Sequence, residues 1–386
     1  MADRHAAVVL GGGLAGTSLA LQLAAAGRDV LLLERSRGPH GKVCGEFLSG
    51  EALHYLHQRG VQPEALGAVP IRQVRLASHG QLSSALLPFP AQSLTRLCLD
   101  EYLLQAAAAA GVEVRRGTHV NSLQAENGGW TIGLREGERV HTRDVFLATG
   151  KHDLRTQPRP AGTHTGLVGF KMYYRLQPAQ TAALRGAVEL ALFPGGYAGL
   201  QPVEGGRANL CLLVDAGALR RCGGIWADLQ RHMLQQSPHL QARLQGAEPL
   251  LDAPLTIASI PYGHVQRATE PGLWRLGDQA AVIPSFSGDG MSIALHSAAL
   301  AARTYLRGDG SEAFQRELAG QMGQRLWLAT ALSRTLVQRP WMAQFAHLFP
   351  ALLPRMASMT RIPNRFLLRT DAADCVDSLR QEDAHG

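Results

Sequence analysis

The chain has 386 residues, of which 46% are hydrophobic and 18% are charged. This composition is typical of a folded protein with a sizeable core and excludes a disordered chain, and the length is enough for two packed lobes. The formal net charge is +7, but only three of the 38 basic residues are lysines, and the arginines are scattered. We therefore expect no nucleic-acid partner.

The cysteines and histidines have no pattern of a covalent framework or a metal centre. The five cysteines form no CxxC pair, and the 15 histidines form no HExxH motif. The sequence therefore predicts no disulfide framework and no metal site, and it favours a reducing, cytoplasmic location. Outside the first glycine-rich unit there is no apolar run of about 20 residues, so we expect no membrane-spanning segment.

Residues 6–34 have the pattern of a βαβ unit that binds a dinucleotide. A short apolar strand is followed by Gly11, Gly13 and Gly16, which have the GxGxxG spacing. Gly11 permits a tight turn, Gly13 lets the backbone approach a pyrophosphate, and Gly16 lets the helix pack on the strand. The free N–H groups at the start of that helix would bind the anion.

An acidic residue completes this unit. Glu34 ends the second predicted strand, 18 positions after the last glycine. A carboxylate there is expected to accept hydrogen bonds from an adenosine ribose, and its charge disfavours a 2′-phosphate. The unit therefore predicts FAD or NAD, and not NADP.

Later segments alternate between cofactor-type and strand-type patterns. Residues 95–123 and 145–150 have strands and a helix that return to the first unit, and residues 272–291 contain Gly277-Asp278 and Gly288-Asp289-Gly290-Met291. Between them, residues 69–89 and 164–214 have partial strand alternation. From residue 311 apolar residues recur at helical spacing, and a polar tail follows residue 371.

These motifs together resemble FAD-dependent oxidoreductases and monooxygenases of the para-hydroxybenzoate hydroxylase and geranylgeranyl reductase superfamily, which have the glutathione-reductase-type FAD fold. The resemblance implies FAD as the cofactor, with NAD(P)H as a transient electron donor. It further implies that residues from several separate segments hold FAD: Gly11, Gly13, Leu14, Ala15, Gly16, Glu34, Arg35, Lys42, Cys44, Arg96, Val120, Gly150, Gly277, Asp278, Pro284, Gly288, Asp289, Gly290 and Met291.

The segment from Lys42 to Ser49 is similar to the CGE-type loop of geranylgeranyl reductases and to a related loop of flavin-dependent halogenases. The resemblance places this loop beside the flavin ring, where Cys44 either donates a proton or packs as a small apolar residue. Tyr197 and Phe286 are further candidates for the reacting pocket. Cys44, Tyr197 and Phe286 are therefore the predicted catalytic residues.

The expected fold is α/β (α+β), with a Rossmann-like FAD-binding lobe, an interleaved mixed or antiparallel sheet that binds substrate, and C-terminal helices. The expected FAD-binding domain is discontinuous, with residues 1–70, 95–160 and 265–310. The substrate domain is expected at residues 71–94 and 161–264, and the C-terminal helical region at residues 311–386.

The resemblance favours a monooxygenase that uses reduced flavin and O₂, through a C4a-hydroperoxyflavin, on an aromatic or lipophilic small molecule or a protein-bound group. One alternative is a reductase of isoprenoid or other C=C bonds. Another is a flavoprotein that matures or escorts a larger partner. The residues alone leave these three open.

Overall fold

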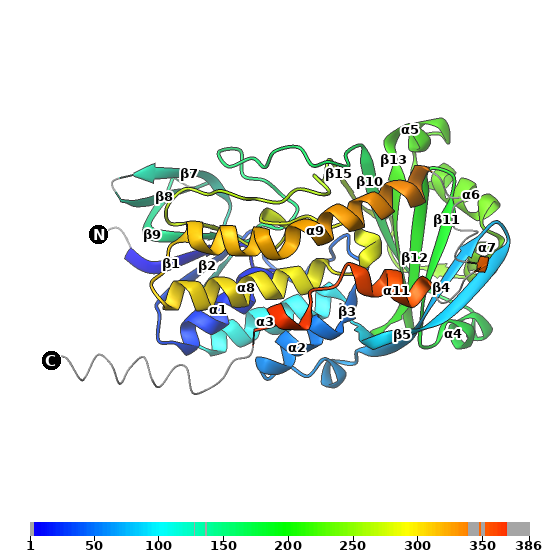
Figure 1. Ribbon diagram of the computed structural model, residues 1–386, viewed down its shortest axis with the longest axis horizontal. Helices are drawn as coiled ribbons and strands as arrows, with labels where there is room; N and C mark the ends of the chain where they lie inside the picture. Colours follow the sequence, from blue (N-terminus) through cyan, green and yellow to red (C-terminus); the bar gives the residue numbers. More distant parts are fainter. Residues whose placement is uncertain (1–3, 127, 136, 339–346, 349–351, 369–386) are drawn as a thin grey trace.

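The computed structural model describes residues 4–126, 128–135, 137–338, 347–348 and 352–368. Within these residues, two mixed sheets lie toward opposite ends of an elongated molecule, and long helices run between them (Figure 1). This arrangement confirms the predicted mixed α/β class. The predicted polar tail after residue 371 lies outside the described residues.

The first sheet carries the glycine-rich unit. In the described part of the chain it has seven strands, in the order β6-β2-β1-β9-β8-β7 with β16 paired to β9. β1, β2, β6, β9 and β16 pair in parallel, whereas β7, β8 and β9 are antiparallel neighbours. Its strands are β1 (Arg4–Leu10), β2 (Val30–Glu34), β6 (Glu113–Arg116), β7 (Val120–Glu126), β8 (Gly129–Leu134), β9 (Arg139–Leu147) and β16 (Leu273–Arg275).

Helices cover the parallel strands, so these strands are apolar along their length. All five residues of β2 are buried. Helices α1 (Leu14–Ala25), α3 (Arg96–Ala109) and α8 (Gly290–Leu306) pack together on this sheet. Because β1 and β2 are parallel, their carboxyl ends meet at one edge, where α1 begins.

The second sheet has nine strands among the described residues, in the order β14-β10-β13-β12-β11-β4-β5-β3 with β15 paired to β10. Its neighbours are antiparallel except for the parallel pair β4 and β11. Its strands are β3 (Phe47–Ser49), β4 (Val69–Ser78), β5 (Gln81–Ser93), β10 (Leu167–Arg175), β11 (Ala187–Phe193), β12 (Gly196–Val203), β13 (Arg207–Asp215), β14 (Glu248–Pro249) and β15 (Leu255–Ala258).

Alternate residues of this sheet face opposite ways. Phe170, Met172 and Leu210 pack against Leu229 and Leu240, which lie on α6 (Trp226–Gln236) and α7 (Pro238–Leu244). The residues between them, such as Lys171 on β10, face the first lobe. One face of the sheet therefore forms a small core, and the other is free to line a site.

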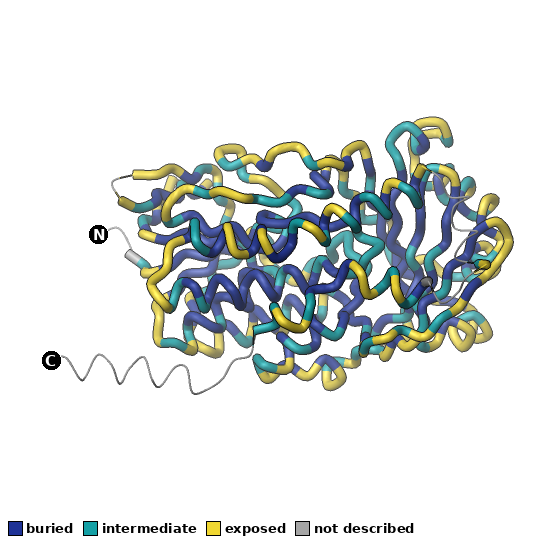
Figure 2. Tube along the Cα trace, in the orientation of Figure 1, coloured by how far each residue is buried: buried dark blue, intermediate teal, exposed yellow. Residues whose placement is uncertain are grey.

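Two C-terminal elements connect the lobes. Helix α9 (Ser311–Gln338) runs beside α8 along the long axis (Figure 1), and its first half packs in the core of the first lobe. Helix α11 (Leu352–Met359) packs on β5. Figure 2 shows α8 almost entirely buried, whereas α9 alternates between buried and exposed residues. No helix in the described part of the chain is long and apolar enough to cross a membrane.

A buried carboxylate ties the second sheet to its covering helices. Glu189 on β11 is 2% exposed and pairs with Arg75 at 2.9 Å, His239 at 2.8 Å and Arg243 at 3.0 Å. Burial would raise the pKa of Glu189, but the hydrogen bonds from His239 and Arg243 outweigh it and lower this pKa from 4.5 to about 2.

We predict that this carboxylate makes stability depend on pH. Its folded-state pKa lies below the unfolded value, so its contribution is fully present above about pH 4.5 and is lost as the pH falls toward about 2. The Glu189→Gln variant should lose about 3 kcal/mol of unfolding free energy at pH 7. Urea unfolding should show that the difference in unfolding free energy between wild type and Glu189→Gln becomes smaller from pH 7 to pH 3. A difference that stays constant over this range would contradict the assignment.

Candidate functional site

A cavity of about 960 Å³ lies between the two lobes. It is bounded by the carboxyl edge of the first sheet, the loop of residues 41–46, the inward face of the second sheet, and parts of α9 and α11. Its size is that of a site for a large cofactor or an organic ligand. Segments far apart in the sequence therefore meet around one space.

The structure brings almost all of the predicted site residues to this cavity. The predicted catalytic residues Cys44, Tyr197 and Phe286 line it. Of the residues predicted to hold FAD, only Gly16, Pro284 and Asp289 are outside the lining. The residues predicted to hold FAD that do line it are Gly11, Gly13, Leu14, Ala15, Glu34, Arg35, Lys42, Cys44, Arg96, Val120, Gly150, Gly277, Asp278, Gly288, Gly290 and Met291.

The start of α1 has the properties of a site for a doubly charged anion. Gly13 is its N-cap, no side chain caps the helix, and its first turn has no acidic residue. A Cβ built on Gly13 would lie 3.3 Å from Lys42 Nζ and 3.4 Å from Arg96 Nη2. The Lys42 and Arg96 side chains therefore lie close to free backbone N–H groups at the positive end of the helix dipole. This cradle fits a pyrophosphate.

One carboxylate holds both cations in place. Asp100 Oδ2 accepts from Lys42 Nζ at 2.6 Å, and Arg96 Nε donates to Asp100 Oδ1 at 2.7 Å. Burial would raise the pKa of Asp100, but Arg96 and Lys42 outweigh it and lower this pKa below its usual value. The cluster therefore keeps one net positive charge for the anion.

The glycine turn is sterically required. Gly11 has φ +111°, and a Cβ there would lie 2.5 Å from the Ala148 carbonyl oxygen. Gly16 lies under the turn, where a Cβ would be 2.0 Å from the Gly11 carbonyl oxygen. A side chain at Gly16 would therefore clash with the glycine turn, and this close packing explains why Gly16 does not line the cavity.

Glu34 lies at the end of β2, beside this turn. Its Oε2 accepts from the Gly12 N–H at 2.6 Å and its Oε1 from the Ser36 N–H at 2.7 Å. Burial would raise the pKa of Glu34, but these two N–H groups outweigh it and lower the pKa. Each oxygen keeps a second lone pair, so this ionised carboxylate can still accept from a ribose hydroxyl.

The start of α8 forms the other end of the cofactor region. Gly288 and Gly290 line the cavity, and no side chain caps α8. Asp289 is not part of the lining, and its buried side chain accepts from Thr360 Oγ1 at 2.7 Å and pairs with Arg361 at 2.9 Å. Asp289 therefore anchors the segment that follows α11, a contact that local motif spacing could not reveal.

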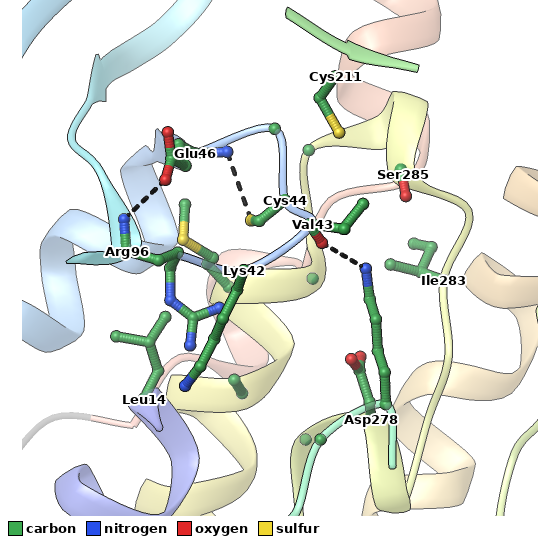
Figure 3. A pocket seen from close by; sticks show the side chains of 18 of the residues that line it. Leu14, Lys42, Val43, Cys44, Glu46, Arg96, Cys211, Asp278, Ile283 and Ser285 are labelled. Atoms are coloured by element: carbon green, nitrogen blue, oxygen red, sulfur yellow. Dashed lines mark hydrogen bonds between the residues drawn. The ribbon is translucent and has the colours of Figure 1, made fainter. Parts of the chain in front are cut away.

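Lysines from two other parts of the chain fix the loop of residues 41–46, and Figure 3 shows Val43, Cys44 and Glu46 of this loop beside Arg96. Lys171 Nζ on β10 donates to the Lys42 carbonyl at 3.1 Å and pairs with Glu46 Oε1 at 2.5 Å. Lys151 Nζ donates to the Val43 carbonyl at 2.8 Å. One of the three lysines of the chain therefore lies in this loop, and the other two donate hydrogen bonds to it.

Two polar residues of the second sheet also bind the backbone of this loop. Asn209 Nδ2 donates to the Gly45 carbonyl at 2.9 Å, and Gln201 Nε2 donates to the same carbonyl at 2.8 Å. Glu46 itself has φ +61°, a backbone conformation that costs a non-glycine residue about 1–3 kcal/mol. The surrounding contacts hold the loop in that conformation.

This hold positions Cys44. Its sulfur accepts from the Glu46 N–H at 3.3 Å. Burial would lower the pKa of Arg96, but Asp100 and the nearby Cys44 sulfur raise it above its usual value. The half-buried thiol therefore lies beside a permanent positive charge and faces the cavity.

The far part of the cavity is apolar. Its wall consists of strand side chains from β4, β5 and β11 and of helix side chains from α9 and α11: Val74, Leu76, Leu87, Val188, Leu190, Leu332, Leu336, Leu353 and Met356. The inward face of the sheet thus changes from polar at β10 and β13 to apolar at β11 and β4. Sequence reasoning did not identify the strand side chains of this wall, because single apolar residues in strands do not indicate which face they occupy.

We predict that Arg96 contributes directly to cofactor affinity. In the Arg96→Leu variant, Lys42 still neutralises Asp100, but one charge-assisted contact worth about 1.5–3 kcal/mol is lost. The dissociation constant for FAD, measured by fluorescence titration of the apoprotein, should rise about tenfold to hundredfold. Arg175→Leu is the control, because Arg175 pairs with Glu248 at the surface. Equal FAD affinity in all three proteins would contradict the role of Arg96.

Comparisons with known proteins agree with this geometry. Residues 4–145 match the family described as FAD binding domain. The chain is 25% identical over 383 residues to menaquinone reductase of Mycobacterium tuberculosis, covering 93% of this chain and 88% of that protein. It is 29% identical over 304 residues to digeranylgeranylglycerophospholipid reductase 2 of Methanopyrus kandleri, covering 75% and 73%.

A solved structure shares the fold at full length. The flavin-dependent brominase Bmp2 superposes with a TM-score of 0.76 at 16% identity, and the match covers 100% of both chains. The pyrophosphate cradle, the ribose carboxylate and the glycine turn fit FAD, as the sequence predicted. Residues 4–145 therefore form an FAD-binding domain, in a chain whose relatives and structural neighbours belong to the FAD-dependent monooxygenase, halogenase and geranylgeranyl reductase superfamily.

Proposed function

We propose that this FAD-dependent oxidoreductase reduces a carbon–carbon double bond in a lipophilic, isoprenoid-type substrate. The observation that carries this proposal is the Cys44 thiol, which lines the cavity between the cofactor cradle and the apolar wall, with Arg96 beside it. FAD, when reduced, supplies a hydride. Saturating an alkene needs a proton as well, and Cys44 is the residue of this chain that would donate it.

The residues around Cys44 suit a proton donor. The Arg96 guanidinium would stabilise the negative charge that remains on sulfur after the proton leaves. The Glu46 N–H, which already donates to this sulfur, would stabilise the same charge. Lys171, Lys151 and Asn209 hold the loop, so the thiol is oriented before the substrate binds.

The apolar wall suits the binding of an isoprenoid substrate. An isoprenoid chain has no hydrogen-bonding groups, so it binds by burying apolar surface, at about 25 cal/mol per Å². Leu87, Leu353 and Met356 offer such a surface and exclude water from the reacting carbon. Two of the relatives that match most of the chain are named as reductases of menaquinone and of a digeranylgeranyl lipid, which supports the same substrate class.

Hydroxylation, which the sequence favoured, stays a prediction, and it makes no use of a thiol beside a guanidinium. NAD(P)H as electron donor and an escort role toward a larger partner stay predictions as well. The free thiols of the described residues suit a reducing compartment such as the cytoplasm. A functional test must therefore separate double-bond reduction from oxygen insertion.

We predict that Cys44→Ala and Cys44→Ser reduce turnover at least about a hundredfold, the typical contribution of a general acid. The assay follows saturation of the isoprenoid tail of a short-tailed menaquinone by product mass, with the anaerobic holoenzyme and dithionite as reductant. FAD content should not change. Cys98→Ser is the control, because Cys98 lies outside the cavity lining and its thiol faces the Leu66 carbonyl. Full turnover in Cys44→Ala would show that this cysteine only packs.

A further inference from the structure

Tyr197 has a buried hydroxyl group that the protein does not satisfy. It lies on β12, is 2% exposed and lines the cavity. Its hydroxyl makes no hydrogen bond of normal geometry with the described residues, although the Phe286 backbone N–H lies near its oxygen. The O–H group has no acceptor among the described residues. A buried polar group without a partner is destabilising, so such groups in folded proteins call for a specific reason.

The other tyrosines show how unusual this is. The chain has seven, all within the described residues. The hydroxyls of Tyr55, Tyr173, Tyr174, Tyr262 and Tyr305 are hydrogen-bonded to His296, Glu46, Gln230, Ser285 and the Ala6 carbonyl, respectively. Tyr102 is 38% exposed and reaches solvent. Tyr197 is thus the one buried tyrosine in the described chain whose hydroxyl is left unpaired.

The surroundings of Tyr197 are apolar. Its ring packs edge-on against Phe286, with centroids 6.1 Å apart, and belongs to the same buried cluster as Leu76 and Val337. Burial raises the pKa of Tyr197 well above its usual value. The phenol therefore stays protonated at neutral pH, and it can donate a hydrogen bond inside the apolar part of the cavity.

The strand register separates this donor from the reacting thiol. Tyr197, Gly199 and Gln201 are alternate residues of β12, and all three line the cavity. Gln201 holds the loop that carries Cys44. Tyr197 lies four residues before Gln201 on the same strand, so the hydroxyl and the thiol line different parts of one cavity.

We propose that Tyr197 donates a hydrogen bond to an oxygen atom of the lipophilic substrate, so that the site selects a substrate with a carbonyl or quinone oxygen over a plain hydrocarbon. This proposal rests on the proposed function and specifies its substrate. A site built to pair with such an oxygen rejects the matching hydrocarbon, because the buried hydroxyl would stay unpaired.

Binding to the oxidised holoenzyme tests this without turnover. Two probes are titrated while the absorbance of bound FAD is followed: menaquinone with a short isoprenoid tail, and the corresponding isoprenoid hydrocarbon without oxygen. The Tyr197→Phe variant keeps the ring and removes only the hydroxyl. We expect it to bind the quinone about tenfold more weakly than wild type and the hydrocarbon equally well. The control is Tyr262→Phe, because Tyr262 is not part of the lining and its hydroxyl is already paired with Ser285.

Unchanged quinone affinity in Tyr197→Phe overturns the proposal, as does an equal loss for both probes. It is overturned as well if the wild type does not bind the quinone. The expected binding pattern without any double-bond reduction would leave Tyr197 as the oxygen contact and refute the proposed reaction instead. The two failures are therefore distinguishable.

Discussion

The buried ion pair between Lys171 and Glu46 is the contact on which the rest of the site depends. Both side chains are fully buried, with the charged atoms 2.5 Å apart. Burial raises the pKa of Glu46 above its usual value, although Lys171 opposes this effect. Removing either partner would leave an uncompensated charge inside the protein, which is strongly destabilising. The pair joins β10 of one lobe to the loop that carries Cys44 in the other, so the position of that thiol follows the packing of the two lobes.

The two ends of the cavity near this contact differ in polarity. At one end, cations, free helix N–H groups and a ribose carboxylate accept a charged cofactor, and at the other end most of the lining side chains are apolar. Cys44 lies between them, and Tyr197 adds a hydroxyl group within the mainly apolar part. The inward face of the second sheet changes from polar at β10 and β13 to apolar at β11 and β4. A lipid that carries a polar group matches this division.

The sequence was sufficient to predict those parts of the site whose residues are close together in the chain. The glycine turn and Glu34 lie within about 30 consecutive residues, and their spacing alone indicates the cradle. Lys171 and Asn209 reach the loop from more than 120 residues away, through a strand register that spacing does not encode. The sequence did contain one indication of these contacts, because an arginine-rich chain has only three lysines. A compact ammonium group fits narrow sites between carbonyls where a guanidinium does not.

The most direct test of double-bond reduction is the mass of the product. The holoenzyme is incubated with the short-tailed menaquinone and dithionite in deuterium oxide under argon, and in a parallel reaction with NADH under isotopically labelled oxygen. We predict a product that has gained two deuterium atoms in the isoprenoid tail, because dithionite supplies only electrons and both hydrogens added to the double bond therefore come from the solvent. A product that carries labelled oxygen, with no saturated tail under argon, would contradict it.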